Sequence, residues 1–308
     1  MGVFGAFSRA GRWFRGNCHT HTTLSDGKSS AAAVATMYRR AGYHFLFLTD
    51  HRKAQPEVDS LCRRGFLALP GIELHPAATL KGFGVHHIIG LGIRATPNAS
   101  FMDRATAGSV IRWIERQGGI PVYGHPYWTG HDIRVMNEGR RALGMEVFNS
   151  VCETTRGLGD SGAQYDQALT LGMRWAALAV DDLHEVERDR FGGWIMLKAA
   201  ALTERAILDA IRRRRFYATQ GPVIQSLTLR RNVARIECSP VRRIVWHSRG
   251  PAGVGVTAGR ALLTRHAFDV KHLAAAATYL RVEITDAHGL KAWSNPVWRN
   301  PAARRWEE

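Results

Sequence analysis

The stretch Asn17-Cys18-His19-Thr20-His21 opens a polar segment, NCHTHTTLSD, which runs to Asp26 and decides the fold class. His19 and His21 occupy alternate positions, so in an extended strand both imidazoles point to one side, where a single metal ion could bind them. A His-x-His pair is weak evidence by itself in a chain with 14 histidines. The pair becomes informative because of the motifs that follow it.

Five further polar motifs follow in order, each after a short apolar run. They are Thr49-Asp50-His51, Pro70-Gly71-Ile72-Glu73, His86-His87-Ile88-Ile89-Gly90, Gly124-His125-Pro126 and Asp181-Asp182-Leu183-His184. Burying many ionisable groups together is costly unless cations coordinate them. Imidazoles mixed with carboxylates suit zinc, manganese or iron, and so many nitrogens disfavour calcium. We therefore predict two or three divalent transition-metal ions, with these ligands: His19, His21, Asp26, His51, Glu73, His87, His125, Asp182 and His184.

One position in this ligand set stays open. His86 and His87 are neighbours, and a shift of one residue in the register exchanges the two faces of a strand. His86 is therefore the rival of His87 as a ligand. Cys18, between the metal-binding positions of the first motif, should face away from the ions if the strand alternates, and we expect it to contribute to packing.

The pattern from 16 to 217 alternates short apolar runs with amphipathic stretches, which predicts an α/β fold of strand-helix units. Each predicted ligand falls at or just beyond the C-terminal end of a strand, where the loops of parallel barrels converge. After residue 219 the pattern changes to alternating strands, so we predict a metallohydrolase barrel over 1–218 and an antiparallel β domain over 219–308. Helices are expected over 29–41, 104–117 with Asp103 as its cap, 161–171 and 203–214.

Composition sets further bounds on the chain. Its 308 residues are 45% hydrophobic, enough for a substantial core. The four cysteines are widely spaced, and no stretch stays apolar long enough to span a bilayer, so a cytoplasmic protein without a membrane partner is expected. The net charge of +16 favours anionic partners, although part of the excess, such as the run 212–215, reads as a solvated helix end. Composition leaves the oligomeric state unknown.

The ordered motifs resemble those of the polymerase and histidinol phosphatase (PHP) family of metal-dependent phosphoesterases. The resemblance covers about 13–217 and rests on GNCHTHTTLSDG at 16–27, TDH at 49–51, PGIE at 70–73, GHP at 124–126 and DDLH at 181–184. The segments at 216–222, 239–241 and 292–296 resemble the β module appended in one bacterial branch of these proteins. The resemblance implies a distorted seven-stranded, (β/α)7 TIM-like barrel with a trinuclear metal site.

The resemblance also implies roles for single residues. One ion would be bound by His19, His21, Glu73 and Asp182. A second ion would be bound by Asp26, His51 and His184. Glu73 would bridge to a third ion, which His87 and His125 would also bind. The catalytic set is then Asp26, His51, Glu73, Asp182 and His184, around a metal-bridging hydroxide that attacks phosphorus. Residues beside the ligands are candidates for positioning the substrate or water: Arg52, Tyr127, Trp128, His131 and Asn149.

These observations favour hydrolysis of a small anionic phosphate ester, such as a nucleotide, a sugar phosphate or a cyclic phosphodiester. Histidinol phosphate ranks lower because of the added β domain. The basic charge also suits a nuclease that trims nucleic-acid ends, which we do not favour, and a non-catalytic, metal-stabilised binding protein is the third alternative. The sequence has no Gly-rich phosphate loop, no His-Glu-x-x-His helix and no Ser-centred elbow, so rival hydrolase mechanisms have no support.

Overall fold

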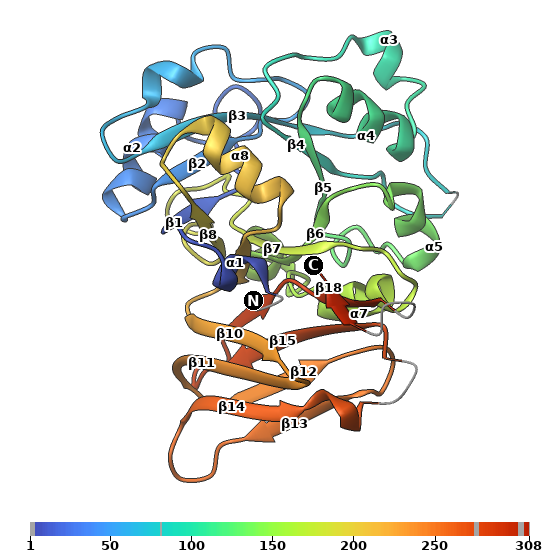
Figure 1. Ribbon diagram of the computed structural model, residues 1–308. Helices are drawn as coiled ribbons and strands as arrows, with labels where there is room; N and C mark the ends of the chain where they lie inside the picture. The colour runs from blue at the N-terminus through green and yellow to red at the C-terminus, as the bar shows by residue number, and fades with distance from the viewer. Residues whose placement is uncertain (1–3, 81, 274–276, 301–304, 308) are drawn as a thin grey trace.

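The protein consists of a mixed α/β part and a β part joined end to end (Figure 1). A computed structural model describes residues 4–80, 82–273, 277–300 and 305–307. Helices surround the sheet of the first part, and the second part consists mainly of strands (Figure 1). Among the described residues, no helix has both the length and the apolar character needed to cross a membrane.

The first part is built on one mixed sheet, in the order β9-β8-β1-β2-β3-β4-β5-β6-β7. Strands β1 to β3 pair in parallel, as do β5 to β7, whereas β8 is antiparallel to β1. The segments that follow β1 and β7 meet at a parallel bridge between Thr20 and Leu183. The strands are β1 (Arg12–Asn17), β2 (Phe45–Leu48), β3 (Leu67–Leu74), β4 (Ile88–Leu91), β5 (Ile120–Tyr123), β6 (Gly144–Asn149), β7 (Ala176–Val180), β8 (Trp194–Ala199) and β9 (Phe216–Thr219).

The predicted α/β class is confirmed, but one of its strands runs in an unexpected direction. Strand β4 is antiparallel to both β3 and β5. Its beginning, where His87 lies, is therefore at the same edge of the sheet as the ends of its neighbours. The prediction that every ligand follows the C-terminal end of a strand is wrong for His87, because apolar periodicity does not show strand direction.

Three of the four predicted helices, α2, α7 and α8, lie within two residues of their expected bounds. The fourth, α4, begins at Ala107 rather than at 104, and Asp103 is not its cap, because Thr106 caps it and forms a capping box with Ser109. The shorter helices α1, α3, α5 and α6 were not predicted. The α-helices are α1 (Gly5–Ser8), α2 (Ala31–Arg40), α3 (Ala99–Met102), α4 (Ala107–Arg116), α5 (Ile133–Met136), α6 (Ser150–Arg156), α7 (Gly162–Thr170) and α8 (Glu204–Arg212). Short 3-10 helices are η1 (Val58–Leu61), η2 (Asn137–Gly139) and η3 (Val270–His272).

The C-terminal part is antiparallel, as predicted. Strands β10, β11 and β14 form a separate sheet, whereas β13, β12, β15 and β16 continue the large sheet through β9. The sheet therefore crosses the predicted boundary at 218, and the division into two domains there stays a prediction. The strands are β10 (Ile224–Arg230), β11 (Val233–Val241), β12 (Arg243–His247), β13 (Gly253–Thr257), β14 (Leu263–Asp269), β15 (Tyr279–Thr285), β16 (Lys291–Ser294), β17 (Val297–Asn300) and β18 (Arg305–Glu307).

An apolar core joins the two parts. Leu227 and Ile236 of the separate sheet pack with Val282 of β15, and Phe4 and Tyr217 from the first part belong to the same cluster. Helix α1 and strand β18, which come from the two ends of the chain, both lie at this junction (Figure 1). The C-terminal strands are therefore part of the hydrophobic core that supports β8 and β9.

Candidate metal centre

All nine predicted ligands converge at one end of the large sheet, and all of them except His19 and His21 line a pocket of about 440 Å³. They form three groups in which the donor atoms all lie within 4.8 Å of one another. The groups are His21, Asp26, His51 and His184; His19, His21 and Asp182; and Glu73, His87 and His125. Side chains that are up to 165 positions apart in the sequence thus meet at one site.

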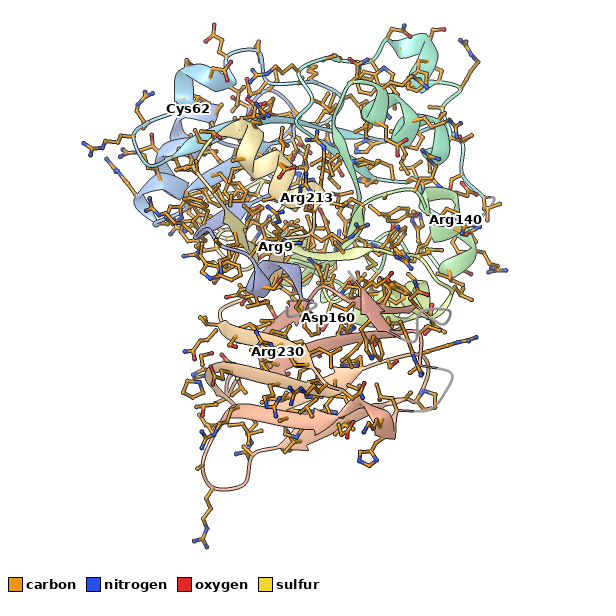
Figure 2. The ribbon with its side chains drawn as sticks, in the orientation of Figure 1. Arg9, Cys62, Arg140, Asp160, Arg213 and Arg230 are labelled. Carbon is orange, nitrogen blue, oxygen red and sulfur yellow. The ribbon has the colours of Figure 1, made fainter. Side chains whose placement is uncertain are left out.

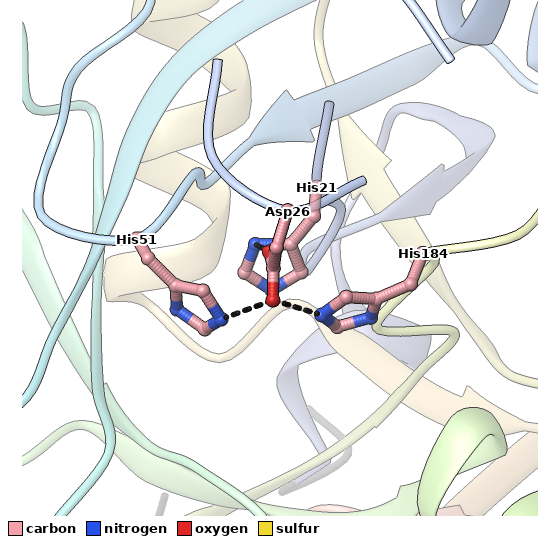
Figure 3. A group of neighbouring side chains, drawn as sticks. All are labelled: His21, Asp26, His51 and His184. Carbon is pink, nitrogen blue, oxygen red and sulfur yellow. Dashed lines mark ion pairs between the residues drawn. The ribbon is translucent and has the colours of Figure 1, made fainter. Parts of the chain in front are cut away.

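Asp26 lies at the outer edge of this site, between two imidazoles (Figure 3). Its Oδ2 is 3.4 Å from Nε2 of His51 and 3.5 Å from Nε2 of His184. The ring of His21 lies beneath, with centroids 4.2 and 4.3 Å from those two rings. Asp50 fixes the loop that carries Asp26. Its carboxylate accepts hydrogen bonds from the Thr22 backbone N–H at 2.7 Å and from the Ser25 hydroxyl.

Glu73 lies at the centre of the site and is fully buried. Its Oε1 is 2.6 Å from Nδ1 of His87. Its Oε2 is 2.7 Å from Nδ1 of His51 and 3.3 Å from Nε2 of His19. The two oxygens of one carboxylate thus face different groups of imidazoles, as a bridging ligand requires.

The tautomer of His19 is fixed by a buried carboxylate. Nδ1 of His19 lies 2.6 Å from Oε1 of Glu146, and a carboxylate can only accept, so Nδ1 carries the proton. Nε2 is thereby turned toward the site, where it lies 3.3 Å from Glu73 Oε2 and 3.2 Å from Asp182 Oδ1. Such a carboxylate behind a histidine is the usual support of a metal ligand.

The buried donors fit a divalent transition ion. Among the described residues, Glu73 Oε2 and Asp182 Oδ1 form no well-directed hydrogen bond, although Glu73 Oε2 lies 2.7 Å from Nδ1 of His51 and Asp182 Oδ1 lies 2.9 Å from Nε2 of His21. Nδ1 of His125 is also buried without a hydrogen-bond partner among these residues. Unsatisfied acceptors in a buried site are costly, and coordination to a cation removes that cost. The donor set of imidazoles and carboxylates suits zinc, manganese or iron.

The pKa values of two imidazoles at the site also show that its carboxylates favour positive charge nearby. Burial acts to lower the pKa of His51, but Asp26 and Glu73 outweigh it and raise the pKa to about 10. Burial likewise opposes the shift at His184, where Asp26 and Asp182 raise the pKa to about 9. Without metal, these imidazoles hold protons at neutral pH in the place where a cation would neutralise the carboxylates.

The neighbouring residues Asp181 and Asp182 have different roles. Asp182 adopts a left-handed φ of 55°, and its Oδ1 faces the site. Asp181 is buried against the hydroxyl of Tyr38 at 2.6 Å and accepts backbone N–H bonds from Gly192 and Gly193. Burial raises the pKa of Asp181 to about 6. Asp181 therefore anchors the segment that leads into β8. Asp182 is the residue that faces the imidazoles of the site.

The structure distinguishes between His86 and His87. His87 faces Glu73 and His125, whereas His86 is buried with Nδ1 2.8 Å from the Tyr123 hydroxyl and Nε2 2.9 Å from a Glu138 oxygen. Both nitrogens of His86 are therefore engaged away from the site. Cys18 is buried in an apolar cluster, in line with the expected packing role.

The candidates for substrate positioning are not all brought to the pocket. Trp128 lines it, with its ring 5.1 Å from that of His125. Arg52 and Tyr127 do not line it, and Arg52 instead donates its backbone N–H to Glu73 O. His131 is buried, with Nδ1 bonded to the Tyr123 hydroxyl and Nε2 to Gly84 O, so it belongs to the structural network of His86. The position of His131 close to His125 in the sequence did not predict that its side chain turns into the protein.

Asn149 is also buried rather than open to the pocket. Its Nδ2 donates to Glu146 Oε2 at 2.9 Å and to Asp182 Oδ2 at 3.1 Å. Asn149 therefore holds the predicted ligand Asp182 in place, and its expected contact with water or substrate is replaced by this contact with two carboxylates.

Comparison with known proteins identifies a similar fold. The sequence matches no protein-family model and no curated protein. A two-domain protein from Bacteroides vulgatus that contains a predicted PHP-like metal-dependent phosphoesterase superposes with a TM-score of 0.54 at 14% identity, over 92% of each chain. The chain shares the fold of that two-domain protein. An amidohydrolase from Chromobacterium violaceum, solved with sulfate and no metal, is 15% identical, with a TM-score of 0.43 over 56% of this chain and 89% of its own.

The likeness extends over the C-terminal part, because nearly the whole of both chains is covered. The predicted resemblance to a PHP-like protein with an added C-terminal module is thereby confirmed at the level of the fold. Neither the number of ions nor the roles of single side chains follow from it.

Four side chains at the site escaped the sequence analysis. Lys28 and Arg188 line the pocket, Glu146 supports His19, and His75 lies beside Glu73. Glu146 carried a signal, since it is the single charged residue of β6 and stands in the apolar run from Met145 to Phe148. Lys28 and Arg188 lack such a signal, because arginine and lysine are common on the surface of this basic chain.

Proposed function

We propose that this protein is a metal-dependent phosphoesterase of the PHP type, acting on a small phosphorylated molecule at a site with two or three divalent ions. The observation that carries the proposal is the convergence of nine imidazole and carboxylate ligands around one pocket. Bound divalent cations supply an acidified water and a positive field for phosphate oxygens. The shared fold with a PHP-like protein supports the same reading.

Cationic side chains on the pocket wall support an anionic substrate. Lys28 lies two residues after Asp26, and its backbone N–H donates to His184 O at 2.8 Å, so it stands beside the outer ligands. Arg188 is held by Asp189, whose Oδ1 is 2.7 Å from its Nε. The other oxygen of Asp189 accepts from the His184 backbone N–H, which ties the position of Arg188 to that ligand. Two cations at the pocket suit the oxygens of a phosphate group.

The size of the pocket favours a small molecule over a polymer. Its volume of about 440 Å³ lies within the usual range of roughly 300–1,000 Å³ for small-molecule sites. Trp128 is 41% exposed and offers an aromatic wall next to His125 and His87, on which an apolar or aromatic part of the substrate can pack. A nucleotide has both a phosphate for the cations and a base for such a surface.

The direct test is hydrolysis by protein purified without chelator. We expect cleavage of phosphomonoesters or small phosphodiesters, loss of activity with a chelator, and recovery when Mn²⁺ or Zn²⁺ is added. His51→Ala should lower kcat/KM by more than about 100-fold while the fold is retained, because it removes a ligand next to Glu73. His288→Ala, at an exposed turn far along the chain, is the control and should retain full activity.

Two outcomes would count against the proposal. Activity that a chelator leaves unchanged would exclude the metal mechanism, and full activity of His51→Ala would exclude this ligand set. Oligonucleotide cleavage with a steep decrease in binding as salt increases would instead identify a polyanion substrate and the nuclease alternative.

A further inference from the structure

His75 stands beside the site although no sequence motif marks it. It follows the end of β3, two residues after Glu73. Side chains two positions apart in an extended segment point to the same side. His75 therefore faces the same pocket as Glu73, and its side chain is only 15% exposed.

The contacts of His75 are with ligands. Its Nε2 lies 3.6 Å from Oε2 of Glu73, and its ring centroid is 4.6 Å from that of His51 and 4.1 Å from that of His87. Donor atoms of His51, Glu73 and His75 all lie within 4.8 Å of one another. This fourth group shares its first two members with the groups described above and adds one imidazole.

The free nitrogen of His75 lacks an explanation within the protein. Nε2 is buried and has no hydrogen-bond partner among the described residues. The separation of 3.6 Å from Glu73 Oε2 is too long for a good hydrogen bond. Two donors that bind one zinc ion at about 2.1 Å each, at the tetrahedral angle, are about 3.4 Å apart, so this separation suits a shared cation.

The structural histidines nearby show what a non-ligand looks like in this protein. His86 and His131 are both buried, and each has both ring nitrogens bonded to protein groups: the Tyr123 hydroxyl, the Glu138 carboxylate or the Gly84 carbonyl. Nε2 of His75 has no such bond to any residue that the structure describes, and it lies against Glu73 instead. Its environment is that of the ligand group rather than that of the structural pair.

We infer that His75 is an additional metal ligand, which binds a divalent transition ion together with Glu73 on the side of the cluster that faces His51. This inference rests on the proposed metal function. It extends the predicted set of ligands to a tenth side chain, which comes from the same segment as Glu73 itself.

Metal binding, measured apart from activity, tests the inference. Metal-free protein is titrated with Co²⁺, and the bound equivalents, their affinities and the visible absorption are compared for wild type, His75→Gln and His75→Asn. His272→Gln, an exposed histidine on η3, is the matched control. We expect one class of Co²⁺ sites to weaken by about 10–100-fold in both His75 variants, with a changed visible spectrum, and no change in the control.

The outcomes separate the inference from the proposed function. If wild type binds Co²⁺ and a folded His75 variant binds it with the same affinity and spectrum, His75 is not a ligand and the proposed function stands. If wild type binds no Co²⁺, both are overturned. The two variants differ in side-chain length, so that either one, once shown folded by circular dichroism and thermal unfolding, suffices for the comparison.

Discussion

At the scale of single residues, the role of each histidine depends on what its second nitrogen contacts. His184 has Nδ1 bonded to the Asp182 carbonyl, which leaves Nε2 to face Asp26. His19 has Nδ1 on Glu146, and its Nε2 points into the site, 3.1 Å from Nε2 of His21 and 3.3 Å from Glu73 Oε2. His131 resembles these residues in sequence context, yet both of its nitrogens are bonded inside the protein. Ordered motifs therefore predicted the residues that meet, but not the partners that decide their chemistry.

Glu146→Gln tests the support behind His19. Oε1 of Glu146 accepts from His19, and Oε2 accepts from the His125 backbone N–H and from Asn149 Nδ2. A glutamine keeps one acceptor but places an NH₂ group against donors. We expect a metal affinity about 10–100-fold lower, with the fold retained, in a calorimetric titration with Zn²⁺.

The exposed Glu57→Gln is the control for this loss and should bind Zn²⁺ like the wild type. An unchanged affinity in Glu146→Gln would show that this carboxylate does not orient a ligand.

At the scale of elements, the sequence predicted the four longest helices and many of the strands, but not how the strands run. The apolar segment around 88–91 has the same periodicity whether it is parallel or antiparallel to its neighbours. Direction depends on which partners it finds in the sheet, and β4 pairs antiparallel on both sides. The later strands β13 and β14 are partly exposed and were not predicted, because little apolar alternation marks them.

Gly144→Ala tests the packing of the strand that carries Glu146. Gly144 begins β6, and a Cβ there would lie 2.2 Å from the Ala176 carbonyl oxygen of β7. Backbone atoms cannot give way as a flexible side chain can. We expect the free energy of unfolding to fall by about 1–3 kcal/mol in denaturant titrations.

Gly259→Ala is the matched control, because a Cβ at that position meets nothing within 4 Å. Equal stability of the two variants would show that β6 and β7 are not packed as closely as described.

At the scale of the whole molecule, ion pairs join the two parts. Arg281 of β15 is fully buried, and its guanidinium lies 2.6 Å from Asp166 of α7 and 3.3 Å from Glu283. Lys291 of β16 pairs with Asp160 at 2.6 Å, at the junction seen in Figure 2. Arg281 and Asp166 are 115 positions apart in the sequence, and Lys291 and Asp160 are 131 apart, so composition and local pattern could not reveal these two pairs.

His247 makes the junction sensitive to pH. Burial is the main cause that lowers its pKa to about 4 from an ordinary value of 6.5. As pH falls below about 6.5, the unfolded chain gains a proton at this position while the folded protein does not, so stability decreases until about pH 4. The charged groups that face His247 are Asp166, Arg243, Arg281 and Glu283.

We therefore expect the free energy of unfolding to fall less steeply between pH 6.5 and pH 4 in His247→Gln than in the wild type. Denaturant titrations at matched pH values measure the two slopes. Other titrating groups are common to both proteins, so identical slopes would mean that His247 remains free to take up a proton when folded.

The most direct measurement for the metal centre is an anomalous difference map, recorded at the zinc edge from crystals grown with Zn²⁺. We predict at least two peaks in the pocket, each about 2.0–2.2 Å from imidazole nitrogens and carboxylate oxygens of the nine ligands, with Glu73 shared between peaks. A map with no peak in this pocket, or with peaks only at surface histidines, would contradict the account.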